Sequence, residues 1–237
     1  MPGMQAHKNK LINLLTDKGI EARFSGQELV CAPDFALDTS YFFDLVVREP
    51  QKIAALVQSK LGLNTRVFAR NCVVKKITKP DAESFLDQYH IMRSTQSASN
   101  YGLFFKDELI AVASFSKGRK MNRLASHERS FELIRFCCKD GITITGGLTK
   151  LVKNFCRDKQ AGDVMTYVDR QFSDGQAFVK AGFKKQGETT PNYFLVNKTN
   201  FERSPAENKD IAFDAEQFYL TQNAGNLKLI YTPDEAL

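Results

Sequence analysis

The sequence has no tryptophan and only three histidines and five cysteines among its 237 residues. The cysteines are odd in number and form no C-x-x-C pair, which argues against a disulfide framework or a zinc site. No apolar run approaches 18 residues, and the opening MPGMQAHKNK lacks the hydrophobic segment of a secretion signal. We therefore expect a cytoplasmic protein with reduced thiols, without a metal site and without a membrane partner.

What the sequence does have is an ordinary globular composition with a surplus of positive charge. It is 43% hydrophobic and 25% charged, with a formal net charge of +6 and a pI near 9.0. A basic balance favours an anionic partner, such as nucleic acid or a phosphorylated cofactor. It is equally compatible with an ordinary basic globular protein.

Residues 1–71 are typical of a small α/β unit. The leucines of HKNKLINLLTDKG predict a helix that ends near Gly19, and Pro50 is a good first residue for a second helix. The runs ELVCAP and YFFDLVV between them predict strands. Some acidic residues of this unit are candidates for residual nuclease chemistry, although they lack the spacing of a nuclease motif: Glu28, Asp34, Asp38 and Asp44.

We place the main domain at residues 72–200 and a C-terminal extension that packs on it at 201–237. The pattern predicts a helix from Pro80, a hairpin, the buried strand ELIRFCCK and a glycine pair. An amphipathic helix, the strand VMTYVDR, a short helix and a final strand NYFLVN follow. Strand alternation puts Glu132 and Arg135 on opposite faces, so we expect no direct pairing between them.

Gly146 and Gly147 join a buried strand to the most regular amphipathic helix in the chain. Free backbone N–H groups and the helix dipole at such a start attract anions, and glycine lets a phosphate approach closely. An ordinary turn is the alternative interpretation. The residues of the candidate anion site are Gly146, Gly147, Leu148, Thr149 and Lys150.

From Ile77 to Val196, this order of elements resembles the GNAT acyltransferases. ELIRFCCK is similar to their central strand, GITITGGLTKLVKNF to their pyrophosphate loop and helix, VMTYVD to the strand that splays away, and GQAFVKAGFKKQGE to the helix with a Gly-Phe step. The resemblance implies an α+β fold with a mixed, mostly antiparallel sheet flanked by helices, beside the small N-terminal α/β unit. It also implies acetyl-CoA or a related acyl-CoA as cofactor, bound at the glycine pair and beside Cys137 and Cys138.

A narrower resemblance concerns the GNAT-like module of phage homing-endonuclease-associated proteins and the Mom-type proteins that modify DNA. It rests on segments such as YGLFFKDELIAVASFSKGR, TYVDRQFSDGQAFVKAGF and PNYFL. It implies DNA as a partner, the cytoplasm of a host cell as the location, and a nuclease-like remnant in residues 1–71.

The candidate catalytic residues follow from this resemblance and from their chemistry. Asp169 would orient the acceptor amine or accept its proton, and Tyr167 or Tyr193 would protonate the leaving thiolate. Histidine is the side chain whose unperturbed pKa lies near neutral pH, so His90 would transfer protons or contact DNA. Phe178 stands where the family often has a catalytic tyrosine, and ITITGGLT does not complete the family's loop pattern.

The densest cationic cluster follows the second hairpin strand, and Lys75, Lys76 and Lys79 lie before it in the chain. Lysine and arginine contacts to phosphates would hold a nucleic acid, whereas a solvated loop is the alternative. The candidate nucleic-acid contacts are Lys117, Arg119, Lys120, Arg123 and Arg170.

Two hypotheses remain open from the sequence. The first is a CoA-dependent acyltransferase that acts on an amine, with a DNA base as the favoured acceptor. The second is a DNA-binding module without catalysis, which the incomplete loop and Phe178 favour.

Overall fold

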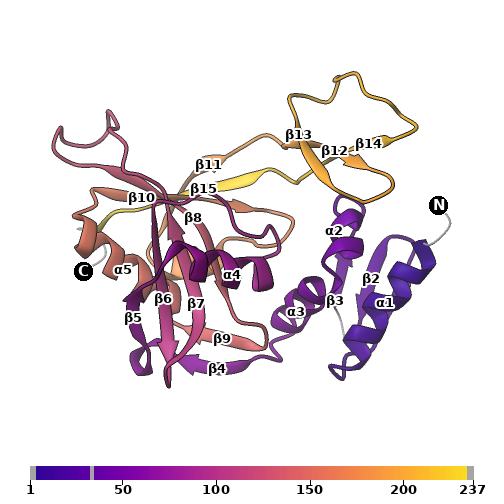
Figure 1. Cartoon of the computed structure of the whole chain (residues 1–237), viewed down its shortest axis with the longest axis horizontal. Helices are drawn as coiled ribbons and strands as arrows, with labels where there is room; N and C mark the ends of the chain where they lie inside the picture. Colours follow the sequence, from indigo (N-terminus) through magenta and orange to yellow (C-terminus); the bar gives the residue numbers. More distant parts are fainter. Residues whose placement is uncertain (1–3, 33–34, 234–237) are drawn as a thin grey trace. The chain divides into compact units, whose positions relative to one another are not determined.

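The computed structural model describes residues 4–32 and 35–233, and the chain divides into two compact units (Figure 1). The first unit comprises residues 1–64 and 190–225, and the second comprises residues 65–189 and 226–237. Each unit therefore contains two separate stretches of the chain. These boundaries differ from the predicted 1–71, 72–200 and 201–237, because both units recruit residues from the C-terminal part.

In the first unit, two helices and a short helix accompany a small antiparallel sheet. The strands pair in the order β1-β2-β3, and Leu11 and Ile53 are buried by the helices. The elements are α1 (Met4–Thr16), β1 (Ala22–Ser25), β2 (Glu28–Cys31), β3 (Phe35–Asp38), α2 (Phe43–Arg48) and α3 (Pro50–Lys60).

The prediction of a strand at YFFDLVV is wrong, because Phe43–Arg48 forms α2. Helical spacing buries Phe42, Leu45 and Val46 together, whereas a strand would send neighbouring residues to opposite faces. The short apolar run fits both periods, so only the tertiary contacts select the helix.

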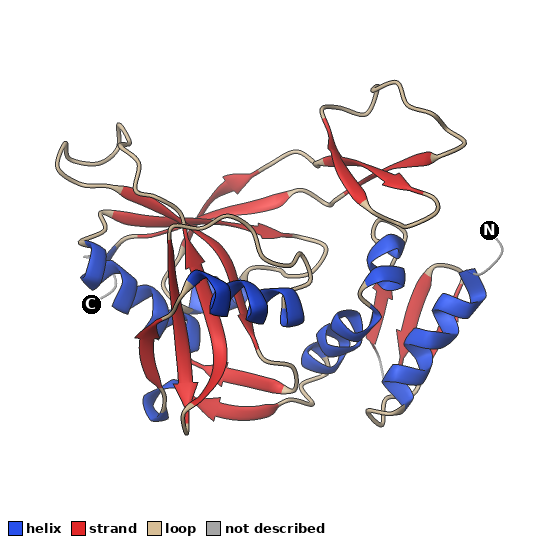
Figure 2. Ribbon diagram, in the orientation of Figure 1, coloured by secondary structure: helices blue, strands red, loops and turns tan. Residues whose placement is uncertain are grey.

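The inserted segment of the first unit is a three-stranded antiparallel sheet with loops, without a helix between residues 190 and 225 (Figure 2). Its strands are β12 (Tyr193–Asn197), β13 (Arg203–Ala206) and β14 (Phe218–Gln222), paired in the order β13-β12-β14. NYFLVN is thus a strand as predicted, but it lies in this sheet and not in the large one.

The second unit contains a seven-stranded sheet in the order β11-β15-β10-β8-β7-β6-β5. Its pairs are antiparallel except β8 with β10, which is parallel. The strands are β5 (Val73–Lys76), β6 (Ser99–Phe105), β7 (Glu108–Phe115), β8 (Ser130–Cys138), β10 (Asp163–Asp169), β11 (Lys184–Glu188) and β15 (Asn226–Tyr231). The helices are α4 (Lys79–Tyr89), α5 (Gly147–Lys159) and α6 (Gln176–Lys180), with the short turn η1 at Ala69–Asn71. The predicted class, a mixed and mostly antiparallel sheet flanked by helices, is confirmed.

The two faces of this sheet carry different helices. On one face, Leu151 and Phe155 of α5 pack against Phe115 and Leu133, and the Phe115 and Phe155 rings stack at 3.7 Å. On the other face, Phe85 and Leu86 of α4 pack against Val112. Burying a phenylalanine or leucine side chain contributes roughly 1.5–3 kcal/mol, so both faces stabilise the sheet.

The strand that completes the sheet comes from the C-terminal end of the chain. β15 lies between β10 and β11 and pairs antiparallel with both. Its alternating Leu227, Leu229 and Tyr231 are buried, as expected for a strand with one face in the core. Residues 226–231 are therefore an internal strand of the main sheet. Residues 234–237 of the predicted extension lie outside the described residues.

A fourth, two-stranded parallel sheet joins β4 (Thr65–Phe68) to β9 (Ile142–Thr145). The sequence predicts no strand at Ile142–Thr145, because the partner strand lies more than 70 residues earlier in the chain. Among the helices of the described ranges, none is long and apolar enough to cross a membrane.

Asp44 of α2 is buried in an ion pair with Arg203 of β13. The Arg203 Nε and Nη2 atoms donate to its two carboxylate oxygens at 2.5 and 2.8 Å, and Nη2 also donates to the Tyr41 carbonyl. The side chains are 1% and 8% exposed. This gives Asp44 a structural role. Asp34, the neighbouring nuclease candidate, lies outside the described residues.

We predict that Asp44→Asn lowers the free energy of unfolding of the first unit by about 3 kcal/mol, because it leaves a buried arginine without its countercharge. Urea unfolding of the full chain measures this. Asp210→Asn, at an exposed position, is the control and should change stability by less than about 0.5 kcal/mol. An equal effect of both substitutions would contradict a structural role for the ion pair.

Candidate functional site

The parallel ladder between β8 and β10 is short. It pairs Ser130 to Glu132 with Asp163 to Met165, although the strands continue to Cys138 and Asp169. Thr166 Oγ1 donates a 2.9 Å hydrogen bond to the Leu133 carbonyl in the core, in the place where the next ladder bond would form. Beyond this point, the backbones of the two central strands do not pair with each other in the described structure.

α5 begins directly after β9, whose Ile144 backbone hydrogen-bonds the Cys138 thiol at the C-terminal end of β8. Gly146 has a left-handed backbone (φ +77°) that favours glycine, and it is the N-cap residue. A Cβ on Gly147 would lie 2.9 Å from the Ile144 side chain, so the helix can start close to β9 only with glycine there. The first-turn N–H groups of a helix have no partner within the helix and form an anion-binding end.

Lys150, one turn into α5, is held by the segment before β5. Its Nζ atom donates to the carbonyls of Ala69 and Cys72 at 2.9 and 2.5 Å, and a Cβ on Gly146 would be in van der Waals contact with the Ala69 side chain at 3.6 Å. The ammonium group is therefore used to attach η1 to the helix start. An anion at the start of α5 would be held mainly by backbone N–H groups. Lys150 would add its positive charge without a direct hydrogen bond to the anion.

Cys137 and Cys138 lie on opposite faces of β8. Cys138 packs on the α5 side, where burial raises the pKa of its thiol to about 12, and Cys137 packs on the α4 side. A thiol with such a raised pKa is not a nucleophile near neutral pH. Cys138 thus acts as an apolar core residue of β8.

Glu132 and Arg135 are brought together by a β-bulge, which overturns their predicted placement on opposite faces. The register of β7 with β8 shifts at Ile134, so that Phe115 pairs with Leu133 and Ser114 with Arg135. An extra residue in a strand re-aims the side chains after it. Burial lowers the pKa of the Arg135 guanidinium, and the nearby Glu132 carboxylate acts against this.

Polar side chains form a row across three central strands on the α4 face. Asn100 of β6 pairs with Ser114 of β7, which pairs with Arg135 of β8. Asn100 and Ser114 are 6% and 1% exposed. The buried Ser114 Oγ has no hydrogen-bond partner in the structure, and native proteins rarely leave such a group unpaired. This row is the feature of the sheet that core packing does not explain.

Arg135 links this row to the turn after α4. Its Nε donates to the Arg93 carbonyl at 3.1 Å and its Nη1 to the Ile134 carbonyl. In the same turn, His90 Nδ1 accepts from the Met92 N–H at 3.1 Å. In the neutral imidazole, the proton therefore lies on Nε2. The side chain of Arg135 is therefore bonded to Arg93, which follows His90 by three residues in the chain.

The predicted catalytic residues of β10 point away from α5. Val164 and Val168 face α5, so the alternation puts Tyr167 and Asp169 on the α4 face with Glu132. Tyr167 is 42% exposed. Asp169 Oδ1 accepts the Gln171 N–H at 2.9 Å, which makes Asp169 a turn former.

Tyr193 and Phe178 lie on other elements of the chain. Tyr193 belongs to β12 of the first unit. Phe178 packs against the α5-side core, with its ring edge-on to Phe183 at 5.6 Å. Of the four predicted catalytic residues, the structure brings Tyr167, Asp169 and the turn that carries His90 to the α4 side of one sheet.

The predicted nucleic-acid residues divide into exposed and structural ones. Lys117, Arg119 and Lys120 are exposed in the loop after β7, and Arg119 lies 3.7 Å from Glu132. Arg123 is different, because its Nε and Nη2 atoms bind the buried Asp163 at 2.7 Å.

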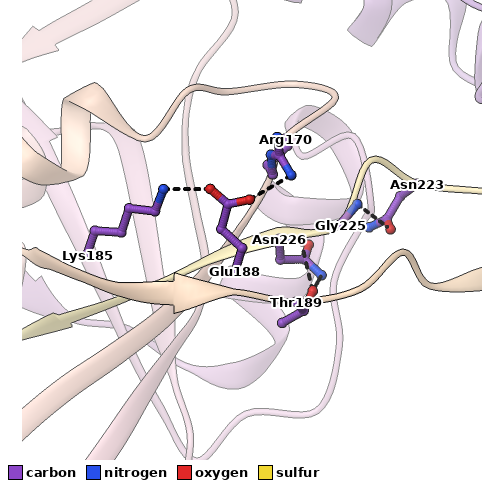
Figure 3. A network of polar contacts seen from close by, with 7 residues as sticks. All are labelled: Arg170, Lys185, Glu188, Thr189, Asn223, Gly225 and Asn226. Atoms are coloured by element: carbon purple, nitrogen blue, oxygen red, sulfur yellow. Dashed lines mark hydrogen bonds and ion pairs between the residues drawn. The ribbon is translucent and has the colours of Figure 1, made fainter.

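Arg170 pairs with Glu188 at 2.9 Å, and Glu188 also pairs with Lys185 at 2.6 Å (Figure 3). Both cations lower the pKa of the Glu188 carboxyl, with the hydrogen bond from Lys185 as the larger cause. The charge of Arg170 is partly neutralised by this contact. Among the described residues, no group of three or more His, Cys, Asp or Glu could hold a metal ion.

Sequence reasoning missed Ser114, Asn100 and Thr166. The signal for Ser114 was present, since a serine interrupts the apolar strand LIAVASF. Asn100 and Thr166 gave no signal of their own, because their importance depends on which strands become neighbours.

Comparisons with known proteins follow this geometry. No family model matches the chain, and neither does a curated protein. Solved structures with similarity include a GNAT family acetyltransferase from Elizabethkingia anophelis with acetyl-CoA bound (TM-score 0.41, 14% identity, 68% of this chain and 98% of that chain). A Bacillus subtilis acetyltransferase in complex with CoA has a TM-score of 0.40, 14% identity and coverage of 68% and 97%. Arabidopsis thaliana Naa50 with a bisubstrate analogue has a TM-score of 0.45, 8% identity and coverage of 68% and 99%. Similarity at this level carries no conclusion about activity.

We predict that Ser114→Ala leaves the free energy of unfolding unchanged or raises it by up to about 1 kcal/mol, because it removes a buried hydroxyl without a partner. Ser130→Ala is the matched control. Ser130 is 3% exposed, and its Oγ accepts from Arg123 Nη2 at 3.0 Å, so this variant should lose about 1–2 kcal/mol. Urea unfolding distinguishes the two, and an equal loss would show that the Ser114 hydroxyl is bonded in solution.

Proposed function

We propose that this chain is a CoA-dependent N-acyltransferase, which transfers an acyl group from a thioester to an amine. The observation that carries the proposal is that the β8–β10 ladder ends after three pairs, while β8 continues to Cys138 near the glycine start of α5. An extended ligand with amide groups can add to an unpaired strand edge through backbone hydrogen bonds. A diphosphate suits the start of a helix. Acyl-CoA has both parts in this order.

The residues present fit such a ligand. The part of β8 beyond its ladder with β10 would hold the amide arm, and the α5 start from Gly147 to Thr149 would hold the diphosphate. The cofactor supplies the activated acyl group. The chain positions the thioester at the end of the β8–β10 ladder. There, polar side chains on the α4 face can contact the acceptor amine.

The α4 face provides groups for the proton transfers of the reaction. The acceptor amine must lose a proton, and the leaving sulfur must gain one. Glu132, half-buried and close to the Arg135 guanidinium, offers a carboxyl group that can accept a proton or a hydrogen bond. The exposed phenol of Tyr167 is a donor for the leaving sulfur. His90, with Nδ1 engaged, offers an Nε2–H donor in its neutral form.

We predict that acetyl-CoA binds the full chain in a calorimetric titration, and that Thr149→Glu weakens this binding by at least about tenfold. The new carboxylate lies in the first turn of α5, where it suits the helix dipole but repels a diphosphate. Thr149→Gln is the control of nearly equal size without charge, and it should bind acetyl-CoA much as the original chain does.

Pantetheine, which lacks the phosphates, separates the two parts of the cofactor in the same experiment. Its affinity should be unchanged by Thr149→Glu. Absence of acetyl-CoA binding at millimolar concentration, or an equal loss in the Glu and Gln variants, would count against the proposal.

For the acceptor, we propose a base of DNA. The exposed Lys117 and Lys120 lie in the loop that leads from β7 to β8, and exposed lysines contact phosphates. The quoted sequence segments resemble the GNAT-like module of phage homing-endonuclease-associated proteins, whose broad fold the Mom-type DNA-modification proteins share, and this supports the same acceptor. In this proposal, the loop holds the phosphates while the base amine reaches the α4 face.

We predict that Lys117→Ala with Lys120→Ala raises the KM for DNA and makes the salt dependence of DNA binding less steep by about one to two units of slope. Arg119 is left intact because it lies beside Glu132. Acetyl-CoA affinity in the same double variant is the internal control and should not change. Unchanged DNA binding would exclude this loop as the contact.

A DNA-binding module without catalysis is the second candidate. It is favoured by the use of Lys150 to hold Ala69 and Cys72 and by the packing of Phe178 in the core. Steep salt-dependent DNA binding together with no affinity for acetyl-CoA would select this candidate over the acyltransferase.

A further inference from the structure

The edge strand β5 and the segment before it carry positive charge without acidic residues. Between residues 65 and 80 the sequence has no aspartate or glutamate. Its basic residues, all exposed, are Arg66, Arg70, Lys75, Lys76 and Lys79. Lysines on an edge strand also protect it from pairing with other chains, so the charge alone does not identify a ligand.

Aromatic rings accompany these cations. The Arg70 guanidinium lies over the Phe68 ring at 5.0 Å, and Lys75 Nζ lies over the Phe104 ring at 4.8 Å. Phe68 is 43% exposed. Protection of a sheet edge explains the lysines, but it does not explain a large exposed ring paired with an arginine.

The register places these groups at one end of the sheet. β5 begins with Val73, which pairs with Phe104, directly before the β6–β7 turn, and Lys75 reaches Asp107 of that turn at 3.9 Å. η1 precedes β5 and therefore enters at the same end, where Figure 1 also shows β4. Val73 is 58% exposed, which adds apolar surface beside Phe104, its cross-strand partner.

We propose that this surface, formed by Phe68, Arg70, Val73, Lys75 and Phe104, binds single-stranded nucleic acid. Aromatic side chains that alternate with cations stack on unpaired bases while the cations contact the phosphates. A duplex hides the faces of its bases, so the rings favour a single strand. The proposal does not rest on the proposed acyl transfer, because binding is measured without CoA.

The test is the fluorescence anisotropy of a labelled oligothymidylate, longer than the roughly 4–16 nucleotides of a single binding fold, titrated with the full chain at several salt concentrations. Arg70→Ala with Lys75→Ala should weaken binding about tenfold at low salt and reduce the salt slope by about one. Lys10→Ala with Lys18→Ala removes the same charge from exposed positions in the first unit, and it should have little effect.

Phe68 tests the stacking contribution separately from charge. Phe68→Ala should weaken binding about five- to tenfold, and Phe68→Trp should retain it, because a larger ring still stacks on a base. The side chain is exposed, so folding should survive, which circular dichroism checks. An oligouridylate of the same length shows whether binding depends on ribose or deoxyribose. Tight binding of either the DNA or the RNA oligonucleotide supports the proposal.

Three results would overturn it: no binding at low salt, an equal loss in the Lys10 and Lys18 double variant, or no effect of Phe68→Ala together with equally tight binding of duplex. Acetyl-CoA binding by the same preparations is a separate measurement. Its failure with intact oligonucleotide binding would remove the acyltransferase proposal and leave this one standing.

Discussion

The parallel contact between β8 and β10 stops after three residue pairs, and the candidate site depends on this interruption. A strand pair that ends inside a sheet leaves backbone groups without partners, which is unfavourable in a core. Thr166 satisfies the first of them by donating its hydroxyl to the Leu133 carbonyl. Leu133 and Val164 meanwhile remain packed against the α5 side. The strands can therefore part at the centre of the sheet while the core beneath them stays closed.

On the α4 face of the sheet, part of the contact between helix and sheet is polar. Between a helix and a sheet, apolar residues normally fill the contact, as Val112 and Leu86 do here. Asn100, Ser114 and Arg135 interrupt that pattern in one row. A buried hydroxyl without a partner is unfavourable by about 1–3 kcal/mol. Features of this kind concentrate at functional sites, where a ligand completes the hydrogen bonds.

The positively charged side chains have two different roles, which the amino-acid composition does not distinguish. Arg203 and Arg123 bind the buried carboxylates of Asp44 and Asp163, and they belong to the folding of the two units. Lys117 and Lys120 are exposed and remain available to an anionic partner. Arginine forms bidentate contacts in buried positions more readily than lysine does, which accounts for this division.

The sequence by itself determined the local elements of the second unit. The helical period of LTKLVKNFCRDK, the hairpin around Lys106 and Asp107, and Gly146 as the start of α5 follow from patterns within 15 residues, and all were predicted. Tertiary structure decided the rest. The insertion of β15 between β10 and β11, the pairing of β4 with β9 and the helical form of YFFDLVV depend on contacts between distant residues. The bulge at Ile134 moved Arg135 to the face of Glu132, because one extra residue reverses a strand alternation that sequence reasoning assumes to be unbroken.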